Sequence, residues 1–295
     1  MGDIRSREFS RVKTFPHFEL NQAGEPLHFL HANGYPPGCY KPLFELLQTH
    51  YHVFGMLLRP LWGDSKPDEV HDWHPFSDDL LNFLSSQSIP VIGVGHSIGA
   101  IVTLRAALRE PEKFRALVLI DPVLFVPSFL LKWHIVRRLG LGDRLHPLIP
   151  KAKKRRRTFD QLETVFLGYR DRAVFRYMSN ENLRAFIEGM TQKTEQGSYS
   201  LIYSPEWEAQ IYRTGMHDFD IWRGLPNLNI PTLFIRGAET DTFLESAAAF
   251  VKRKQPGARV ETLDRATHLL PLERPREVFG IMQSFFEETL KVSDS

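Results

Sequence analysis

Short apolar runs alternate with segments of helical periodicity along most of the 295-residue chain, and this alternation restricts its fold more than any other feature. The runs predicted as strands are residues 53–58, 91–94, 117–120, 232–235 and 260–263. Between them lie the predicted helices, residues 42–49, 75–85, 98–109, 243–254 and 275–290. Near-continuous hydrophobicity is typical of parallel strands covered on both faces. Strands that alternate with helices predict right-handed βαβ units and a mostly parallel sheet.

Two segments of the chain depart from this alternation. Residues 14–20 and 27–31 flank a polar turn that contains Gly24 and are predicted to pair as a β-hairpin. Residues 125–217 contain no run typical of a buried strand, and their apolar residues recur at helical spacing. A loop of this length without structure is improbable. We therefore predict a core of residues 1–124 and 218–295, with residues 125–217 inserted as a helical unit over the sheet.

The composition excludes several classes of protein. Hydrophobic residues make up 42% and charged residues 24% of the chain, so a disordered or fibrous protein is excluded. The longest apolar runs, such as residues 116–120, are too short to cross a bilayer, and the N-terminus has no apolar signal segment. The single cysteine, Cys39, cannot form an internal disulfide and is expected to be a buried structural thiol. These features predict a soluble cytoplasmic protein.

A basic run interrupts the otherwise balanced charge. Six of the seven residues 151–157 are lysine or arginine, and the other 31 basic side chains are outnumbered by 35 acidic ones. The basic character is therefore local, and nucleic-acid binding is not expected. The favoured interpretation of the run is a solvated helix or loop face, and the alternative is a weak contact with an anionic membrane surface.

The strongest chemical signal is the sequence Gly95-His96-Ser97-Ile98-Gly99. It follows a predicted strand and opens a predicted helix, which is the context that the G-x-S-x-G motif requires. A serine on such a sharp turn sits in strained backbone, and the two glycines remove Cβ atoms that would clash. The hydroxyl then stands above the sheet edge beside a helix N-terminus, where an oxyanion is stabilised. Ser97 is the predicted nucleophile.

A serine nucleophile needs a base, and the base needs an orienting carboxylate. His268 follows the strand at residues 260–263 by a short polar loop and so lies at the carboxyl edge of the sheet, where sites collect. It is the predicted base. Asp241, on the loop after residues 232–235, is the preferred acid, with Asp121 and Glu239 as the alternatives. Asp264 is too close to His268 along the chain to approach it correctly.

With these residues in the order Ser97, Asp241, His268, the chain resembles the α/β-hydrolase superfamily from about residue 12 to residue 290. Residues 29–36 resemble the oxyanion loop of that superfamily. Residues 236–241 resemble its acid loop, with Thr240 in place of serine, and residues 266–275 resemble its base loop. The resemblance implies an α/β-hydrolase fold with a mostly parallel eight-stranded sheet and a helical cap inserted at residues 125–217.

The resemblance also implies an oxyanion hole. Its expected donors are the backbone N–H groups of Asn33 and Ile98, although Ala32 replaces the usual glycine after His31. His31 is expected to orient this loop, and His96 is expected to pack beside the nucleophile rather than to transfer protons.

A serine at the elbow favours acyl transfer, because relatives that open epoxides or displace halide carry aspartate there. The sequence therefore predicts a serine hydrolase that cleaves small-molecule carboxylic esters of small-to-medium apolar acyl groups through an acyl-enzyme. Aromatic residues of the cap are expected to line an apolar acyl pocket. The alternatives are a lactonase, an amidase, a C–C bond hydrolase, or a non-catalytic binding protein of the same fold. The chain carries no cofactor fingerprint, no metal-ligand spacing and no signal for its oligomeric state.

Overall fold

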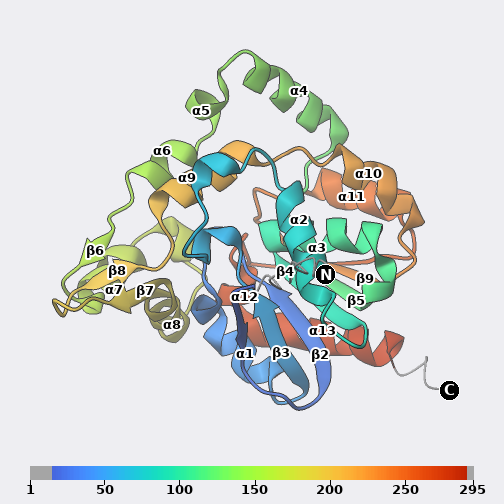
Figure 1. Ribbon diagram of the computed structural model, residues 1–295, viewed down its shortest axis with the longest axis horizontal. Coiled ribbons are helices and arrows are strands. Elements are labelled where there is room, and N and C mark those ends of the chain that lie inside the picture. Colours follow the sequence, from blue (N-terminus) through green and yellow to red (C-terminus); the bar gives the residue numbers. More distant parts are fainter. Residues whose placement is uncertain (1–14, 291–295) are drawn as a thin grey trace, which may run out of the picture.

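The computed structural model describes residues 15–290 and has an α/β-hydrolase fold, in which a mostly parallel sheet has helices on both faces (Figure 1). The strand order across the sheet is β1-β3-β2-β4-β5-β9-β10. The strands are β1 (His17–Glu19), β2 (Glu25–Leu30), β3 (Tyr51–Met56), β4 (Val91–His96), β5 (Phe114–Ile120), β9 (Thr232–Gly237) and β10 (Arg259–Leu263). All neighbouring pairs are parallel except β1 with β3. The predicted fold class is confirmed.

Two details of the predicted sheet are wrong. Residues 15–290 contribute seven strands to it rather than eight. The predicted hairpin does not form either, because β3 lies between β1 and β2. Asn21, in the connecting turn, explains this arrangement: its side-chain Oδ1 accepts a hydrogen bond from the Val53 N–H at 2.9 Å, and its Nδ2 donates to the Tyr51 carbonyl at 2.9 Å. The turn is therefore tied to β3.

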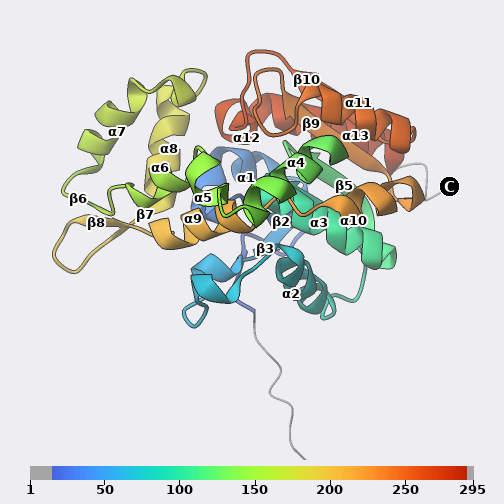
Figure 2. The same cartoon turned by 90° about the horizontal axis from the view of Figure 1, so that it is seen from above.

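Helices cover the two faces of the sheet and bury two separate hydrophobic cores (Figure 2). One face carries α2 (His74–Leu84), α3 (Ile98–Arg109), α10 (Phe219–Gly224) and α11 (Glu245–Lys254). The other carries α1 (Lys41–Leu47), α12 (Leu270–Glu273) and α13 (Pro275–Thr289). Leu117 and Leu119 of β5 face the first core, whereas Val118 and Ile120 face the second. This alternation explains why the central strands are apolar at every position.

The chain leaves the sheet after β5 and returns to it at β9, as the sequence predicts. The segment between contains α4 (Pro127–Arg138), α5 (Gly142–Leu145), α6 (Ile149–Lys153), α7 (Leu162–Arg170), α8 (Asn180–Met190) and α9 (Pro205–Thr214). It also contains a small antiparallel sheet that was not predicted, made of β6 (Thr158–Phe159), β7 (Thr191–Lys193) and β8 (Tyr199–Leu201). In Figure 1 this sheet lies with α7 and α8 on the left, and α4 and α5 form an arch at the top. The boundaries 125–217 of a separate unit stay a prediction.

Short 3₁₀ helices complete the connections. They are η1 (Pro37–Tyr40), η2 (Arg59–Leu61), η3 (Pro67–Glu69), η4 (Pro111–Lys113), η5 (Ala173–Phe175) and η6 (Leu225–Asn227). No helix within residues 15–290 has both the length and the apolar character needed to cross a membrane.

Helix α8 of the inserted segment packs directly on η1 of the core. The backbones approach so closely that a Cβ atom on Gly189 would lie 2.1 Å from the carbonyl carbon of Gly38. Beside this contact, the Cys39 thiol is buried and lies 3.5 Å from the Phe186 carbonyl oxygen. Burial raises the pKa of the Cys39 thiol, so it stays protonated, as expected of a structural cysteine.

Replacing Gly189 tests this contact. Alanine normally stabilises a helix relative to glycine by about 0.8–1 kcal/mol, but at residue 189 the added methyl group overlaps the η1 backbone. We expect Gly189→Ala to lower the free energy of unfolding by about 1–3 kcal/mol in denaturant titrations. Gly280→Ala in α13 is the matched control, because nothing lies within 4 Å of its added Cβ atom. Equal stability changes in the two variants would contradict the close packing of α8 on η1.

Candidate active site

Ser97 lies on the sharp turn between β4 and α3, with φ 59° and ψ −119°. Two close approaches of backbone explain why this turn needs its flanking glycines. A Cβ atom on Gly95 would lie 2.4 Å from the Gly99 carbonyl oxygen, and one on Gly99 would lie 2.1 Å from the Leu30 carbonyl oxygen. The strained serine between two glycines is therefore the strand-turn-helix geometry that the sequence predicts.

The structure brings Ser97 and His268 together, although they are far apart in the sequence. The His268 Nε2 atom lies 3.0 Å from the Ser97 Oγ atom. On the other side of the ring, Nδ1 lies 2.7 Å from Oδ2 of Asp121. A carboxylate only accepts hydrogen bonds, so Nδ1 carries the ring proton and Nε2 is free to accept the Ser97 hydroxyl proton. The three groups form one chain of hydrogen bonds at the carboxyl edge of the sheet.

The Asp121 carboxylate is fully buried and is surrounded by donors. Its Oδ1 accepts the Gly237 N–H at 3.1 Å. Its Oδ2 accepts the hydroxyl groups of Thr240 at 2.5 Å and Thr242 at 2.6 Å, in addition to His268. Hydrogen bonds to a carboxylate stabilise its ionised form. These donors fix the orientation of the Asp121 carboxylate against the imidazole.

The preference for Asp241 as the partner of His268 is wrong, and the alternative Asp121 takes that place. Both residues follow neighbouring parallel strands, and the Asp121 N–H donates to the Ile235 carbonyl at 2.7 Å. On the loop after β9, Thr240 and Thr242 direct their hydroxyl groups inward to Asp121, whereas Asp241 between them is exposed.

Glu239, the other alternative, does not contact His268 either. Its carboxylate accepts a hydrogen bond from the Tyr177 hydroxyl at 2.5 Å and pairs with Arg176. Both partners belong to the inserted segment, so Glu239 joins that segment to the loop after β9.

The base loop is held by a buried carboxylate. Glu273 accepts hydrogen bonds from the Thr267 N–H at 2.8 Å and from the Thr267 hydroxyl at 2.7 Å. Burial raises the pKa of the Glu273 carboxyl group. The same Thr267 hydroxyl oxygen accepts the Leu269 N–H at 3.2 Å. These bonds fix the two residues on either side of His268, and they explain the glutamate in the predicted base-loop motif.

His96 does more than pack beside the nucleophile. The Ala32 N–H donates to the Tyr40 hydroxyl oxygen at 3.0 Å, and the Tyr40 hydroxyl donates to His96 Nδ1 at 2.8 Å. His96 Nε2 in turn donates to the His268 carbonyl at 2.8 Å. Burial, with the nearby His268 as a smaller cause, lowers the pKa of His96 well below its ordinary value, so the ring stays neutral, as this pattern requires. Tyr40 belongs to none of the sequence motifs, and only the fold places it beside His96.

The oxyanion loop leaves two backbone donors free. The Ala32 N–H is bonded to Tyr40, but the N–H groups of Asn33 and Ile98 have no hydrogen-bond acceptor within the described chain. Ile98 opens α3, where the first N–H groups of a helix have no intrahelical partner. His31 holds the loop, since its Nδ1 donates to the Ala32 carbonyl at 2.9 Å and its Nε2 accepts the Leu58 N–H at 3.2 Å. The assignment of Asn33 and Ile98 to an oxyanion hole stays a prediction.

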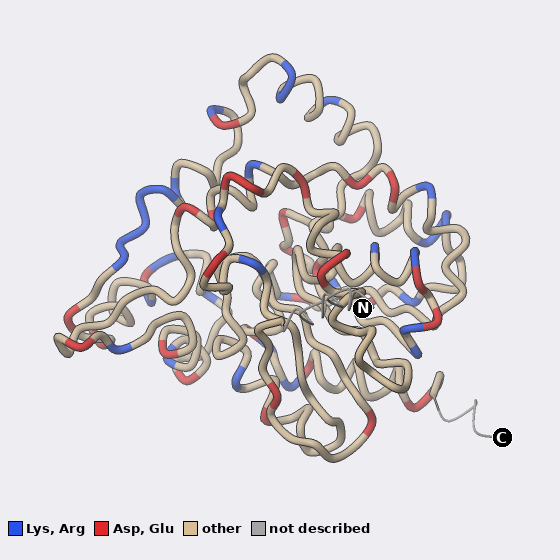
Figure 3. The backbone as a smooth tube through the Cα atoms, viewed as in Figure 1, with Lys and Arg blue, Asp and Glu red and all other residues tan. Residues whose placement is uncertain are grey.

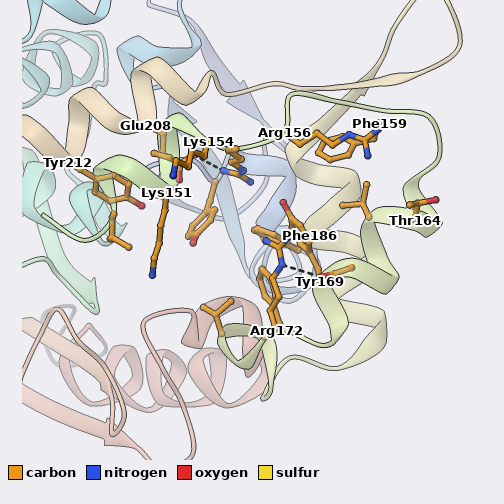
Figure 4. A pocket seen from close by; sticks show the side chains of 18 residues that line it. Lys151, Lys154, Arg156, Phe159, Thr164, Tyr169, Arg172, Phe186, Glu208 and Tyr212 are labelled. Atoms are coloured by element: carbon orange, nitrogen blue, oxygen red, sulfur yellow. Dashed lines mark hydrogen bonds and ion pairs between the residues drawn. The ribbon is translucent and has the colours of Figure 1, made fainter. Parts of the chain in front are cut away.

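A cavity of about 600 Å³ lies almost entirely within the inserted segment (Figure 4). Tyr35 is its one lining residue from the core. Five aromatic residues of the inserted segment also line it, namely Phe159, Tyr169, Phe175, Phe186 and Tyr212. Ser97 and His268 do not line it. The cavity wall reaches the site through Tyr35, whose ring is stacked on that of His96 with 6.4 Å between centroids.

The basic run does not form a single solvated face. Lys151, Lys154, Arg155 and Arg156 line the cavity, and Figure 3 shows the run as a blue stretch of the tube in the inserted segment. Arg157 points elsewhere and pairs with Glu206. Contact of the run with a membrane surface stays a prediction. Among residues 15–290, no group of three or more histidine, cysteine, aspartate or glutamate side chains could hold a metal ion.

A model of the alpha/beta hydrolase family matches residues 29–281, and the chain therefore belongs to that family. Among curated proteins, it is 19% identical to (E)-2-((N-methylformamido)methylene)succinate hydrolase of Acinetobacter baylyi, over 97% of this chain and 98% of the relative. It is also 22% identical to ethanol acetyltransferase 1 of Hanseniaspora uvarum, over 89% of this chain and 80% of the relative.

Solved structures share the fold. E-2-(acetamidomethylene)succinate hydrolase superposes with a TM-score of 0.71 at 19% identity, covering 93% of this chain and 100% of the other. An esterase of Mycobacterium tuberculosis superposes with a TM-score of 0.67 at 18% identity, covering 92% of this chain and 88% of the other. These likenesses support the α/β-hydrolase fold of the chain.

The buried histidines predict how stability depends on pH. Burial lowers the pKa of His28 to about 3 and of His31 to about 4, and it lowers that of His96 as well. Below pH ~6.5 the unfolded chain binds protons that the folded chain excludes, so stability falls as the pH decreases. Each ring lowers the free energy of unfolding by up to about 1.4 kcal/mol for every pH unit of acidification, between pH ~6.5 and the pKa of that histidine in the folded protein. Urea titrations at pH 8, 7, 6 and 5 measure this slope. A free energy of unfolding that is constant from pH 7 to pH 5 would contradict it.

Proposed function

We propose that the protein is a serine hydrolase that cleaves carboxylic esters with Ser97 as nucleophile, His268 as general base and Asp121 as the orienting acid. One observation carries the proposal: Ser97 Oγ, the His268 ring and the Asp121 carboxylate are joined by hydrogen bonds of 3.0 and 2.7 Å. A hydroxyl is a weak nucleophile at neutral pH, and a base in direct contact with it is what acyl transfer requires.

In the acylation step, Ser97 Oγ attacks the ester carbonyl carbon while His268 Nε2 takes the hydroxyl proton. The carbonyl oxygen becomes an oxyanion that the N–H groups of Asn33 and Ile98 stabilise. When this tetrahedral intermediate collapses, the ester C–O bond breaks, and His268 gives its proton to the leaving alkoxide. The products are an alcohol and an acyl group bound to Ser97.

In the deacylation step, His268 removes a proton from water, which attacks the acyl carbonyl carbon. The second tetrahedral intermediate releases the carboxylic acid and returns the proton to Ser97 Oγ. Asp121 stays ionised throughout and stabilises the imidazolium that forms in each step. Its buried position and its threonine and backbone donors support this role.

The inserted segment acts as a cap over this chemistry and supplies the substrate pocket. The aromatic walls of the cavity support binding of the small-to-medium apolar part of an acyl group. Distant relatives and structural neighbours include an esterase, an ethanol acetyltransferase, and hydrolases of (N-methylformamido)methylene- and (acetamidomethylene)succinate. Since these names span several reactions, the bond that is cleaved is the part of the proposal that most needs an experiment.

Exchanging the two candidate acids tests the triad. Asp121→Asn keeps the size of the side chain but removes the charge and favours the wrong tautomer of His268, so we expect kcat to fall by about 10³–10⁴-fold. Asp241→Asn is the matched control and should retain near wild-type activity, because Asp241 is exposed and lies apart from His268. Circular dichroism and thermal melts confirm that both variants fold. The opposite pattern, with Asp241→Asn inactive and Asp121→Asn active, would overturn the assignment.

Covalent labelling tests whether the protein is a hydrolase at all. We expect a fluorophosphonate to label the wild-type protein at Ser97 and to leave Ser97→Ala unlabelled, because only an activated serine reacts. A panel of p-nitrophenyl esters from acetyl to palmitoyl then measures hydrolysis, with Ser97→Ala as the blank. Absence of both labelling and hydrolysis in a folded protein would favour the non-catalytic binding protein. Labelling without ester hydrolysis would direct the search to lactones, amides and C–C substrates.

A further inference from the structure

The cavity in the inserted segment has an unusual charge for a pocket beside a hydrolase site. Five cationic side chains line it, Lys151, Lys154, Arg155, Arg156 and Arg172, together with a single carboxylate, Glu208. Arg155 pairs with Glu208 at 2.7 Å, so these two charges neutralise each other. The remaining four side chains give the cavity a net positive charge at neutral pH.

The protein itself does little to neutralise these four cations. Lys151 and Lys154 have no ion-pair partner in the described part of the chain. Arg156 lies 3.8 Å from Asp160, whose side chain is 92% exposed, so water screens that pair. Arg172 donates to the Gly168 carbonyl at 3.1 Å, and its guanidinium lies 4.4 Å from the centre of the Tyr169 ring. The cavity thus presents cations and aromatic faces to whatever enters it (Figure 4).

The oxyanion loop connects this cavity to the catalytic residues. The Asn33 side chain donates to the Glu208 carbonyl at 3.1 Å, and a Cβ atom on Gly34 would lie 3.5 Å from Nη1 of Arg155. Tyr35 lines the cavity, and its ring is stacked on that of His96 with 6.4 Å between centroids. Because Asn33 and Tyr35 are two residues apart, their Cα atoms lie within about 7 Å of each other. The predicted oxyanion donor and the wall of the cavity are therefore at most about 7 Å apart, a distance that a short aliphatic chain can cover.

The position of the cavity decides which end of an ester enters it. The leaving oxygen must lie within hydrogen-bond reach of His268, but no residue of the base loop lines the cavity. The lining residue from the core, Tyr35, belongs to the oxyanion loop instead, two residues after the predicted oxyanion donor Asn33. We therefore place the acyl group, rather than the leaving alcohol, toward the cavity.

We propose that the preferred substrates are esters whose acyl chain ends in an anionic group, a carboxylate or a phosphate, held in the cavity by Lys151, Lys154, Arg156 and Arg172. The aliphatic part of the acyl chain lies against the aromatic walls. This inference rests on the proposed ester hydrolysis at Ser97 and adds the class of its acyl group. The remote charge raises kcat/KM because its binding energy positions the carbonyl at Ser97.

Paired p-nitrophenyl esters test the proposal. The glutarate monoester carries a terminal carboxylate, and the 5-methylhexanoate ester is its neutral isostere. The 4-phosphonobutyrate ester, paired with the 5,5-dimethylhexanoate ester, distinguishes a phosphate-type anion from a carboxylate. We expect kcat/KM at low ionic strength to favour at least one anionic ester over its isostere by about tenfold, and this ratio to fall as salt is added.

The double variant Lys151→Gln/Lys154→Gln shows whether the cavity is responsible. We expect it to reduce the ratio of kcat/KM for the anionic ester over its neutral isostere to about twofold or less. The matched control is Lys252→Gln/Arg276→Gln, which removes two exposed positive charges outside the cavity and should keep the preference. Equal rates for anionic and neutral esters, or equal loss in both double variants, would overturn the inference.

A binding measurement separates this inference from the proposed function. Ser97→Ala cannot form the acyl-enzyme, so calorimetric titration with p-nitrophenyl glutarate reads binding alone. We expect Ser97→Ala to bind this ester more tightly than its isostere, and Ser97→Ala/Lys151→Gln/Lys154→Gln to lose this difference in affinity. That result supports the anionic cavity even if the wild-type protein hydrolyses no ester. Hydrolysis of neutral esters without any such binding difference supports the proposed function and contradicts the anionic cavity.

Discussion

Close contact between backbones at the Ser97 turn is the constraint on which the site depends. The turn holds a non-glycine residue at φ 59°, and it does so because β4, α3 and the end of β2 meet there with no room for side chains at Gly95 and Gly99. The Ser97 hydroxyl on this turn lies 3.0 Å from the His268 Nε2 atom. The crowding also brings the oxyanion loop, which follows β2, against the first turn of α3. The strain at one residue is thus sustained by three packed elements.

Asp121 shows how the site is assembled from separate loops. Its carboxylate binds the backbone of Gly237, the hydroxyl groups of Thr240 and Thr242, and the ring of His268. A second path runs from Ala32 through Tyr40 and His96 to the His268 carbonyl. Asp121, Tyr40 and His96 are fully buried, and in such surroundings hydrogen bonds are strong and unpaired polar groups are costly. His268 is therefore oriented from its side chain and from its backbone at once.

The inserted segment contacts the core at η1, at the oxyanion loop and at the loop after β9. It packs on η1 through Gly189, bonds Asn33 through the Glu208 carbonyl, and pairs Arg176 with Glu239 beside the loop of Thr240 and Thr242. A shift of this segment would move the oxyanion loop and the loop after β9 together. The basic residues that gave the chain its uneven charge belong to the same segment, and four of them line its cavity. The proposed substrate pocket and the proposed catalytic site consequently share one set of contacts.

The sequence by itself determined the local features of this protein. Three of these features depend only on neighbours in the chain: the alternation of apolar strands and helices, the Gly-x-Ser-x-Gly turn at residues 95–99, and the histidine after the last strand. Ser97, His268 and the fold class could therefore be predicted from the sequence. The acid could not, because Asp121 and Asp241 both follow parallel strands and only the direction of each side chain separates them. Tertiary structure also decided that β3 lies between β1 and β2, that Tyr40 reaches His96, and that the basic run lines a cavity. Each of these outcomes depends on contacts between residues distant in sequence, and a local pattern carries no information about which distant group fills the space opposite a side chain.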